Sequence, residues 1–120
     1  MRKEICIVIA DDHPIMRHGL KQVIEAESNL NVVGEAGNGN EAFSVIEEMQ
    51  PDVAILDVDM PHRDGFQVAK ALIDARNPVE IIFLTIHKED AMFNAALDLG
   101  AKGYVLKDSA IDDIVLAINE

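Results

Sequence analysis

Five short apolar segments recur along the chain, and each is followed by residues whose apolar positions repeat at helical spacing. The segments are Ile5–Ala10, Leu30–Ala36, Val53–Leu56, Ile81–Leu84 and Tyr104–Leu106. Most of them have no polar face, as expected for strands of a parallel sheet that helices cover on both sides. In the second segment, polar Asn31 and Glu35 interrupt the apolar residues, so this strand is predicted to lie at an edge.

The segments between the strands carry start and stop signals of helices. Pro14 suits the first turn of a helix, Asp64 opens the third helix, and Ser109 is a reasonable N-cap for the last one. The fourth helix is expected over about Lys88–Leu99, with Gly100 as its C-cap. The predicted inner faces contain Ala42, Phe43, Ile46 and Met49 in the second helix and Phe66, Ala69, Leu72 and Ile73 in the third. This alternation predicts one α/β domain with a five-stranded, doubly wound parallel sheet, helices on both faces and right-handed crossovers.

The fourth and fifth helices are apolar over more than one face. Their apolar residues are Met92, Phe93, Ala96, Leu97 and Leu99 in the fourth helix and Ile111, Ile114, Val115, Leu116 and Ile118 in the fifth. Two interpretations fit this pattern. One is ordinary burial with single apolar residues left exposed, and the other is a surface that pairs with another chain.

The composition predicts a soluble cytoplasmic domain. The chain has 120 residues, no cationic apolar leader, and no apolar stretch near the roughly 18 residues of a membrane span. Cys6 is the only cysteine, lies inside the first strand, and is expected to be a buried thiol in a reducing compartment. With a formal net charge of −12, the domain itself is not expected to bind nucleic acid, because phosphate contacts require clustered Lys and Arg.

Polar side chains stand at the carboxyl ends of four predicted strands. They are Asp11 and Asp12 after the first strand, Asp57 after the third, Thr85 after the fourth and Lys107 after the fifth. In doubly wound sheets, ligands bind at this edge, where the strand order reverses. We therefore expect three carboxylates, a hydroxyl and an ammonium to converge on one site.

This combination of groups suits phosphoryl transfer. Carboxylates held close together repel one another and need a cation, and carboxylate oxygens are typical ligands of Mg²⁺. Asp57 on the central strand is the candidate nucleophile, with Asp11 and Asp12 as candidate metal ligands. Lys107 and Thr85 are the groups expected to bind phosphoryl oxygens. Each residue alone has a plainer explanation as a turn, cap, strand or solvated residue, but their joint position favours the functional interpretation.

The motifs around these positions resemble those of a known family. They are Ala10-Asp11-Asp12-His13-Pro14, Leu56-Asp57-Val58-Asp59-Met60-Pro61 with Gly65, Leu84-Thr85, and Gly100-Ala101-Lys102-Gly103-Tyr104-Val105-Leu106-Lys107. With this spacing, essentially the whole chain resembles the receiver domain of a bacterial two-component response regulator. The Asp-Asp-His-Pro start and the Gly-Ala-Lys-Gly-Tyr run are most similar to the LuxR-type (NarL/FixJ-like) subfamily, whose members are mostly transcription factors.

The resemblance implies a flavodoxin-like strand order, 2-1-3-4-5, and a phosphorylation switch. Asp57 would accept a phosphoryl group from a sensor histidine kinase or from a small donor such as acetyl phosphate. Mg²⁺, for which Mn²⁺ can substitute, would be held by Asp12, Asp57 and the main-chain carbonyl of Asp59. Asp11 would act on the metal partly through water.

The resemblance also implies an output. Thr85 and Tyr104 would move together on phosphorylation and change either the surface of the fourth helix, fifth strand and fifth helix, or that of the first and fifth helices, where a homodimer would form. Residues 1–120 would be the receiver of a longer regulator, and a separate C-terminal domain, absent from this chain, would bind DNA. Apart from its own phosphoryl transfer and slow autodephosphorylation, the domain would not be an enzyme, and it would not contact membranes.

Three features depart from the general family pattern. Asp59, two residues after Asp57, is acidic where many members have Asn or another neutral residue. His87, two residues after Thr85, is expected to lie across the same opening. Both residues are expected to modulate the lifetime of the phosphorylated state. Asp108 stands where many receivers have proline, so a trans peptide bond is expected before it. Ile86 is bulkier than the small residue often found after the switch threonine.

Three other functions remain open from the sequence. Asp57-Val58-Asp59 resembles the Asp-x-Asp pair of an aspartyl-phosphate phosphohydrolase, although that motif normally follows the first strand of a larger domain. A flavodoxin-like FMN protein would share the strand order, but its first turn would carry Ser, Thr or Gly in place of Asp-Asp. A stand-alone or degenerate receiver would act only as a protein-interaction module.

Overall fold

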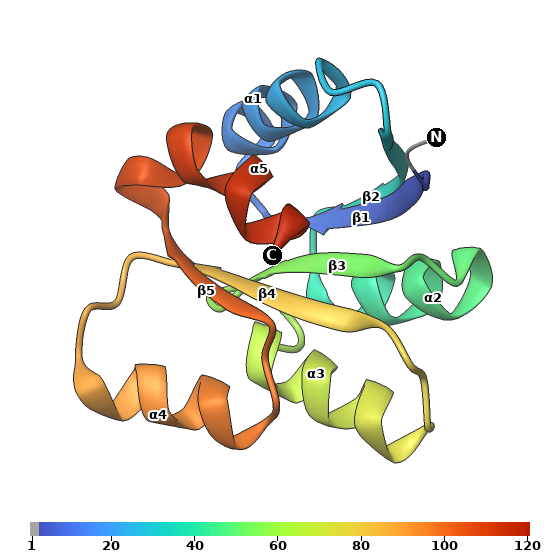
Figure 1. Cartoon of the computed structure of the whole chain (residues 1–120). Helices are drawn as coiled ribbons and strands as arrows, with labels where there is room; N and C mark the ends of the chain where they lie inside the picture. The colour runs from blue at the N-terminus through green and yellow to red at the C-terminus, as the bar shows by residue number, and fades with distance from the viewer. Residues whose placement is uncertain (1–2) are drawn as a thin grey trace.

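The computed structural model describes residues 3–120 as alternating strands and helices (Figure 1). The strands are β1 (Ile5–Ala10), β2 (Leu30–Ala36), β3 (Val53–Asp57), β4 (Glu80–Thr85) and β5 (Gly103–Leu106). The helices are α1 (Pro14–Glu25), α2 (Gly39–Met49), α3 (Gly65–Asp74), α4 (Asp90–Asp98) and α5 (Ala110–Asn119), with a 3-10 turn, η1 (Lys107–Ser109), before α5. The strands pair in parallel in the order β2-β1-β3-β4-β5, which confirms the predicted sheet and the edge position of β2.

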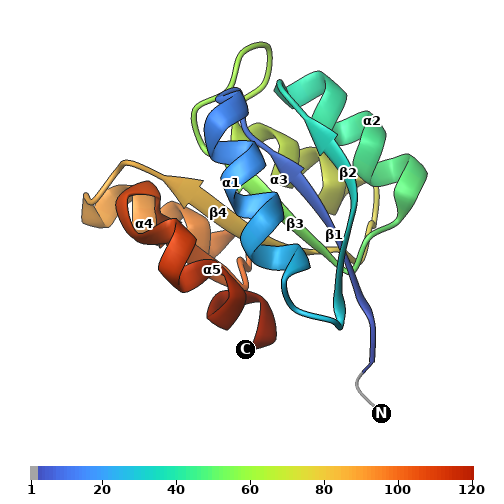
Figure 2. The same cartoon turned by 90° about the horizontal axis from the view of Figure 1, so that it is seen from above.

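Helices cover both faces of the sheet, so successive residues of a strand enter different hydrophobic cores. In β1, Ile7 and Ile9 pack toward α1 and α5, whereas Val8 and Ala10 pack toward α2, α3 and α4 (Figures 1 and 2). Burying an aliphatic side chain of this size stabilises the fold by roughly 1.5–3 kcal/mol. The all-apolar strands are therefore required by the two helical layers, as the sequence predicted.

Strand register fixes the positions of the groups that follow the strands. Ala10 pairs with Leu56, so the next residues on β1 and β3, Asp11 and Asp57, are neighbours. On the other side of β3, Asp57 itself pairs with Leu84. Thr85 ends β4 beside the last residue of β5, which directly precedes Lys107.

The predicted helix signals are largely confirmed. Pro14 occupies the first turn of α1. Asp64 caps α3 in a capping box: its carboxylate accepts from Gln67 N at 2.8 Å, and the Gln67 side chain accepts from Asp64 N at 2.9 Å. Gly100 follows α4 with φ of +76°, a conformation that favours glycine. The peptide bond before Asp108 is trans, as predicted.

Two predictions at helix starts need correction. The fourth helix begins at Asp90 and not near Lys88, because Glu89 has extended backbone and serves as its N-cap. Ser109 does stand at the N-cap of α5, but its hydroxyl donates to Leu106 O at 3.5 Å and caps no helical N–H. The hydroxyl therefore bonds within the preceding 3-10 turn, and the sequence pattern did not predict that turn.

Three apolar residues are less buried than predicted. Met49 and Ile73 are 43% and 47% exposed, because they lie in the last turns of α2 and α3, where the buried positions end at Ile46 and Leu72. Cys6 is a free thiol that is only partly buried, since it lies in the less buried first part of β1.

Several apolar side chains on α4 and α5 are exposed, as the excess of apolar residues in these helices suggested. Phe93 and Leu97 on α4 are 44% and 54% exposed, and Ile111 and Leu116 on α5 are 43% and 63% exposed. Within residues 3–120, no helix has the length and apolar character that crossing a membrane requires.

Candidate functional site

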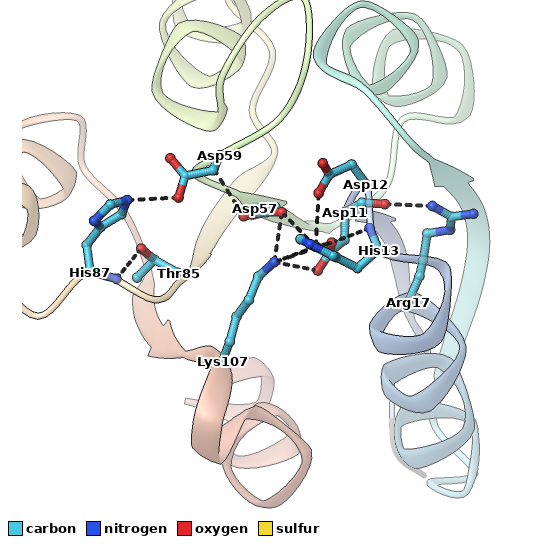
Figure 3. Close-up of polar contacts among 9 residues, drawn as sticks. All are labelled: Asp11, Asp12, His13, Arg17, Asp57, Asp59, Thr85, His87 and Lys107. Carbon is cyan, nitrogen blue, oxygen red and sulfur yellow. Dashed lines mark hydrogen bonds and ion pairs between the residues drawn. The ribbon is translucent and has the colours of Figure 1, made fainter.

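Three charged side chains meet at the carboxyl ends of β1, β3 and β5 (Figure 3). The Lys107 ammonium donates a hydrogen bond to Asp57 Oδ2 at 2.9 Å and lies 3.3 Å from Asp11 Oδ2. Asp11 and Lys107 are 96 positions apart in the chain. The parallel sheet therefore brings together groups from three separate βα units, as the sequence predicted for this edge.

Burial dominates the ionisation of the central carboxylate. The Asp57 side chain is only 1% exposed. Burial raises the pKa of Asp57 to about 7, and the negative charge of Asp11 adds to the rise. The hydrogen bond and charge of Lys107, together with the Asp59 N–H, act in the opposite direction. A further cation beside Asp57 would lower this pKa, because it would favour the charged carboxylate.

Lys107 remains a cation despite being mostly buried. Its side chain is 12% exposed. Burial acts to lower the pKa of Lys107, but the hydrogen bond to Asp57 and the charges of Asp11 and Asp57 outweigh burial and leave the pKa above its usual value. The site therefore contains a positive charge within 3.3 Å of two buried carboxyl groups.

The acidic side chains fit a divalent cation. Asp11 is fully buried and Asp12 is 32% exposed, yet Asp11 Oδ2 and Asp12 Oδ1 accept no hydrogen bond from the described residues. One ligand atom from each of Asp11, Asp12, His13 and Asp57 lies within 4.8 Å of the others. Buried carboxylate oxygens that accept no hydrogen bond are costly even with an ammonium or imidazole nearby, and a hard cation such as Mg²⁺ would satisfy them.

His13 belongs to this cluster, although its position in the sequence predicted no role for it. Its Nδ1 lies 3.0 Å from Asp11 Oδ1, 3.0 Å from Asp12 Oδ1 and 4.0 Å from Asp57 Oδ2. Lys107 Nζ is 3.1 Å from the same nitrogen. The position of His13 directly after two aspartates was the only sequence signal, and the direction of its ring could not be read from it.

A second residue without a predicted role, Arg17, supports the turn after β1. Its Nη1 donates to the main-chain oxygen of Asp11 at 2.6 Å, and its Nε donates to Glu35 Oε1 at 3.2 Å. Lys21 Nζ contacts the other Glu35 oxygen at 3.4 Å. Arg17 lies one turn into α1, and Glu35 lies on the edge strand β2, so these contacts connect the Asp11 turn to two flanking elements.

The loop after β3 is held close to Asp57. Asp59 N donates to Asp57 Oδ1 at 3.1 Å. Gly65 N donates to Val58 O at 2.9 Å, and a Cβ at Gly65 would lie 2.5 Å from Asp57 O. Any side chain at Gly65 would therefore displace the backbone that carries Asp57, which gives a physical reason for glycine there.

The two predicted modulators contact each other across the opening. His87 Nε2 lies 2.8 Å from Asp59 Oδ2, and Glu89 lies 3.6 Å from His87 Nδ1. The side chains of His87 and Asp59 are 29% and 57% exposed. On the same rim Ile86 is 66% exposed and lines a hollow of about 720 Å³ with Lys107 among other residues. These contacts are relevant to how water and small molecules reach Asp57. That Asp59 and His87 modulate the lifetime of the phosphorylated state stays a prediction.

The two predicted switch residues meet at the main chain of His87. Thr85 is fully buried, and its Oγ1 accepts from His87 N at 2.9 Å, so this hydroxyl bonds the loop after β4 in preference to the carboxylates. The Tyr104 hydroxyl donates to His87 O at 2.9 Å, and its ring packs edge-on against Phe93. Burial raises the pKa of Tyr104, opposed by the Thr85 hydroxyl.

Together, the doubly wound sheet and the carboxylate and lysine cluster at its strand ends define an α/β domain with an acidic site that could hold a cation. Comparisons with known proteins agree. Residues 7–119 match the response regulator receiver domain. The "Probable transcriptional regulatory protein NarL" of Mycobacterium tuberculosis is 40% identical over 116 residues, which cover 97% of this chain and 54% of that protein.

Solved structures show the same relationship. The signal receiver domain of NarL from Mycobacterium tuberculosis is 39% identical, with a TM-score of 0.92 over 98% of this chain and 95% of that chain. A DNA-binding response regulator of the LuxR family from Staphylococcus aureus is 30% identical, with a TM-score of 0.90 over 96% of each chain. The chain belongs to the response regulator receiver domain family, and its relatives are transcriptional regulators of the NarL/LuxR type. It spans about half the length of the curated relatives it matches.

Proposed function

We propose that this domain is a phosphorylation switch in which Asp57 accepts a phosphoryl group from a sensor histidine kinase. One observation carries the proposal: Asp57 is buried at the end of the central strand, and the Lys107 ammonium lies 2.9 Å from its carboxylate and 3.3 Å from that of Asp11. A carboxylate in this setting is a nucleophile whose charge the surrounding protein can balance. Family membership favours this chemistry over the phosphohydrolase and FMN-binding alternatives.

The transfer exchanges one bond to phosphorus for another. An Asp57 carboxylate oxygen attacks phosphorus in line. The P–N bond of phosphohistidine breaks and the leaving imidazole nitrogen takes a proton, or the P–O bond of acetyl phosphate breaks and acetate leaves as its anion. Asp57 must be deprotonated to attack, so its raised pKa makes the reaction dependent on charges that favour the carboxylate. Lys107 supplies one such charge and is placed to contact a phosphoryl oxygen.

The acidic residues would hold the cation that the reaction requires. Asp12, Asp57, the main-chain carbonyl of Asp59 and Asp11, partly through water, are the proposed ligands of Mg²⁺, for which Mn²⁺ can substitute. When bound, the ion would draw in phosphoryl oxygens and stabilise the charge of the in-line transfer. The oxygens of Asp11 and Asp12 that accept no hydrogen bond support this assignment.

The output would begin at Thr85. Its hydroxyl is bonded to His87 N, and the Tyr104 hydroxyl is bonded to His87 O, so the loop after β4 connects the two side chains. A phosphoryl group on Asp57 would offer the Thr85 O–H a new acceptor. Movement of Thr85 toward it would break the bond that Oγ1 accepts from His87 N and would free Tyr104 to turn inward. Such a local change can bias a two-state surface.

The changed surface would mediate partner binding. We assign it to the exposed apolar residues of α4 and α5, or to the packed pair α1 and α5, and expect a homodimer on phosphorylation. In a longer chain, a C-terminal domain would bind DNA, in line with the transcriptional relatives, and the regulator would work in the cytoplasm. The domain would catalyse its own phosphoryl transfer and slow dephosphorylation and no reaction on other substrates.

Intact mass after incubation with acetyl phosphate and Mg²⁺ tests the proposal. We expect one phosphoryl group on the wild type and on Asp74→Asn, a control at an exposed aspartate at the end of α3, and none on Asp57→Asn. Size-exclusion chromatography with beryllofluoride should show a dimer. Full phosphorylation of Asp57→Asn would disprove the nucleophile, and no adduct with no beryllofluoride response would indicate a degenerate receiver.

A further inference from the structure

We propose that His13 is an additional metal ligand of the acidic site and makes it selective for late first-row divalent ions such as Ni²⁺ and Cu²⁺ over Mg²⁺. The inference rests on the cation site proposed for Asp11, Asp12 and Asp57. It adds a nitrogen donor to a set of ligands that would otherwise consist of oxygen atoms. The preference of the site among different ions would therefore be set by His13 and not by the three aspartates.

The first argument is geometric. Metal–ligand bonds of about 2.1 Å in an octahedral shell place neighbouring ligand atoms about 3.0 Å apart and opposite ones about 4.2 Å apart. His13 Nδ1 is 3.0 Å from one oxygen each of Asp11 and Asp12, and 4.0 Å from Asp57 Oδ2. The imidazole nitrogen thus stands at the separations expected of a ligand that neighbours two carboxylates and opposes the third.

The second argument is the state of the carboxylates that His13 faces. Asp11 is 0% exposed, and its Oδ2 accepts no hydrogen bond from the described residues, nor does Asp12 Oδ1. Asp11 Oδ2 supports a cation site independently of the histidine, whereas Asp12 Oδ1 is itself 3.0 Å from His13 Nδ1. The His13 side chain is 65% exposed, so its ring can adjust to an ion while the buried carboxylates stay fixed.

Lys107 competes for the same space. Its Nζ lies 3.1 Å from His13 Nδ1 and 2.9 Å from Asp57 Oδ2. An ammonium can only donate, so this contact suits the tautomer in which Nδ1 carries the lone pair, whereas the two carboxylate contacts of Nδ1 suit the tautomer in which it carries a proton. Metal binding requires the first of these tautomers. A bound ion would replace Lys107 at the histidine, while the shorter bond to Asp57 could hold the ammonium in the site.

The donor set determines which ions benefit. Imidazole nitrogen suits Ni²⁺, Cu²⁺ and Zn²⁺, whereas Mg²⁺ prefers oxygen ligands and water. Affinity for a mixed nitrogen and oxygen site rises from Mn²⁺ to Cu²⁺ along the first transition row. Removing His13 should therefore weaken Ni²⁺ and Cu²⁺ binding and leave Mg²⁺ binding nearly unchanged.

Calorimetric titration with Ni²⁺ and with Mg²⁺ tests the proposal on the full chain. His13→Asn is the main variant, because asparagine preserves a favourable N-cap for α1. We expect Ni²⁺ affinity to fall by about tenfold or more, in line with the loss of an imidazole donor, and Mg²⁺ affinity to change by less than about threefold. His18→Asn, at an exposed histidine of α1 outside the cluster, is the matched control and should change neither affinity.

Pulsed EPR of one equivalent of Cu²⁺ identifies the ligand directly. Imidazole nitrogen modulation should be present in the wild type and in His18→Asn, and absent from His13→Asn. Failure of the wild type to bind Mg²⁺ would overturn the proposed cation site itself. Normal Mg²⁺ binding with unchanged Ni²⁺ affinity and unchanged nitrogen modulation in His13→Asn would overturn only the role of the histidine.

Discussion

Two regions of the site differ in how they are held. We call Asp11, Asp57 and Lys107 the charge cluster, and Asp59, Thr85, His87 and Tyr104 the His87 bridge. The charge cluster consists of side chains that are at most 12% exposed, located at strand ends and joined by ion pairs. The His87 bridge is joined largely through the main chain of one loop residue, and its outer carboxylate is 57% exposed.

The difference separates what the sheet determines from what a loop determines. The charge cluster cannot rearrange without moving buried strands or leaving a buried charge unpaired, which is costly. The His87 bridge can exchange partners at the cost of hydrogen bonds that water replaces in part. A rigid reacting centre next to a rearrangeable loop is the arrangement that a switch needs.

The largest expected effect comes from removing the charge that burial disfavours. Asp57→Asn should stabilise the protein in the absence of divalent cations. The folded-state pKa of about 7 lies above the ordinary value of 3.8, so the stability that protonated Asp57 contributes is present at low pH and is lost as pH rises through 7. At 1.36 kcal/mol per pKa unit, the upper limit of the gain is about 4 kcal/mol, reduced by the lost ion pair with Lys107.

Urea denaturation of the wild type and Asp57→Asn between pH 4 and pH 8 measures this effect. The two stability curves should diverge as pH rises from about 4 to 7 and run parallel above that. Mg²⁺ should stabilise the wild type more than the variant. Parallel curves over the whole range would contradict the pKa of Asp57 and the importance of burial in the charge cluster.

The opposite change in the same cluster should destabilise the protein. Lys107→Ala leaves two buried carboxyl groups without their shared cation, and breaking a buried pair in this way costs about 3 kcal/mol. Lys70→Ala, at an exposed lysine of α3, is the control and should change the unfolding free energy by less than about 0.5 kcal/mol. Equal stabilities of the two variants in urea at pH 7 would show that the charge cluster is not held by its lysine.

The charge cluster could be predicted from the sequence because its position follows from strand ends. All-apolar runs located the strands, and parallel pairing then placed the residues after Ala10 and Leu56 side by side. The His87 bridge could not be predicted in the same way. Its bonds run to the main chain of a loop residue, and no periodicity fixes the path of that loop.

The residues that sequence reasoning missed share this property. The ring of His13 and the guanidinium of Arg17 reach their partners through side-chain rotamers, which an apolar pattern does not specify. The exposure of Ile73 and Cys6 has a related cause. Helical spacing gives the face of a residue but not where along the helix or strand the core ends.

A moderate effect is expected where the charge cluster meets its support. Arg17→Met removes the bond to Asp11 O and the ion pair with Glu35 but keeps the apolar stem. We expect a loss of about 1–2 kcal/mol in stability and weaker Mg²⁺ binding by calorimetry, since the Asp11 turn would be less fixed. Lys21→Met removes the other contact of Glu35 and should leave Mg²⁺ binding unchanged. Equal effects of both variants would mean that Arg17 acts only through Glu35.

The smallest effect is expected in the His87 bridge, and it decides whether the two regions are independent. Tyr104→Phe removes the hydrogen bond to His87 O and keeps the edge-on contact with Phe93. Because Tyr104 is half-buried, water can replace the lost partner, and the loss should be about 0.5–1 kcal/mol in urea denaturation. Mg²⁺ affinity should stay at the wild-type value, because the bridge contacts the charge cluster through the Asp59 main chain and not through Tyr104. A fall in Mg²⁺ affinity like that of Arg17→Met would instead show that the loop after β4 and the buried carboxylates already respond to each other before any phosphoryl group arrives.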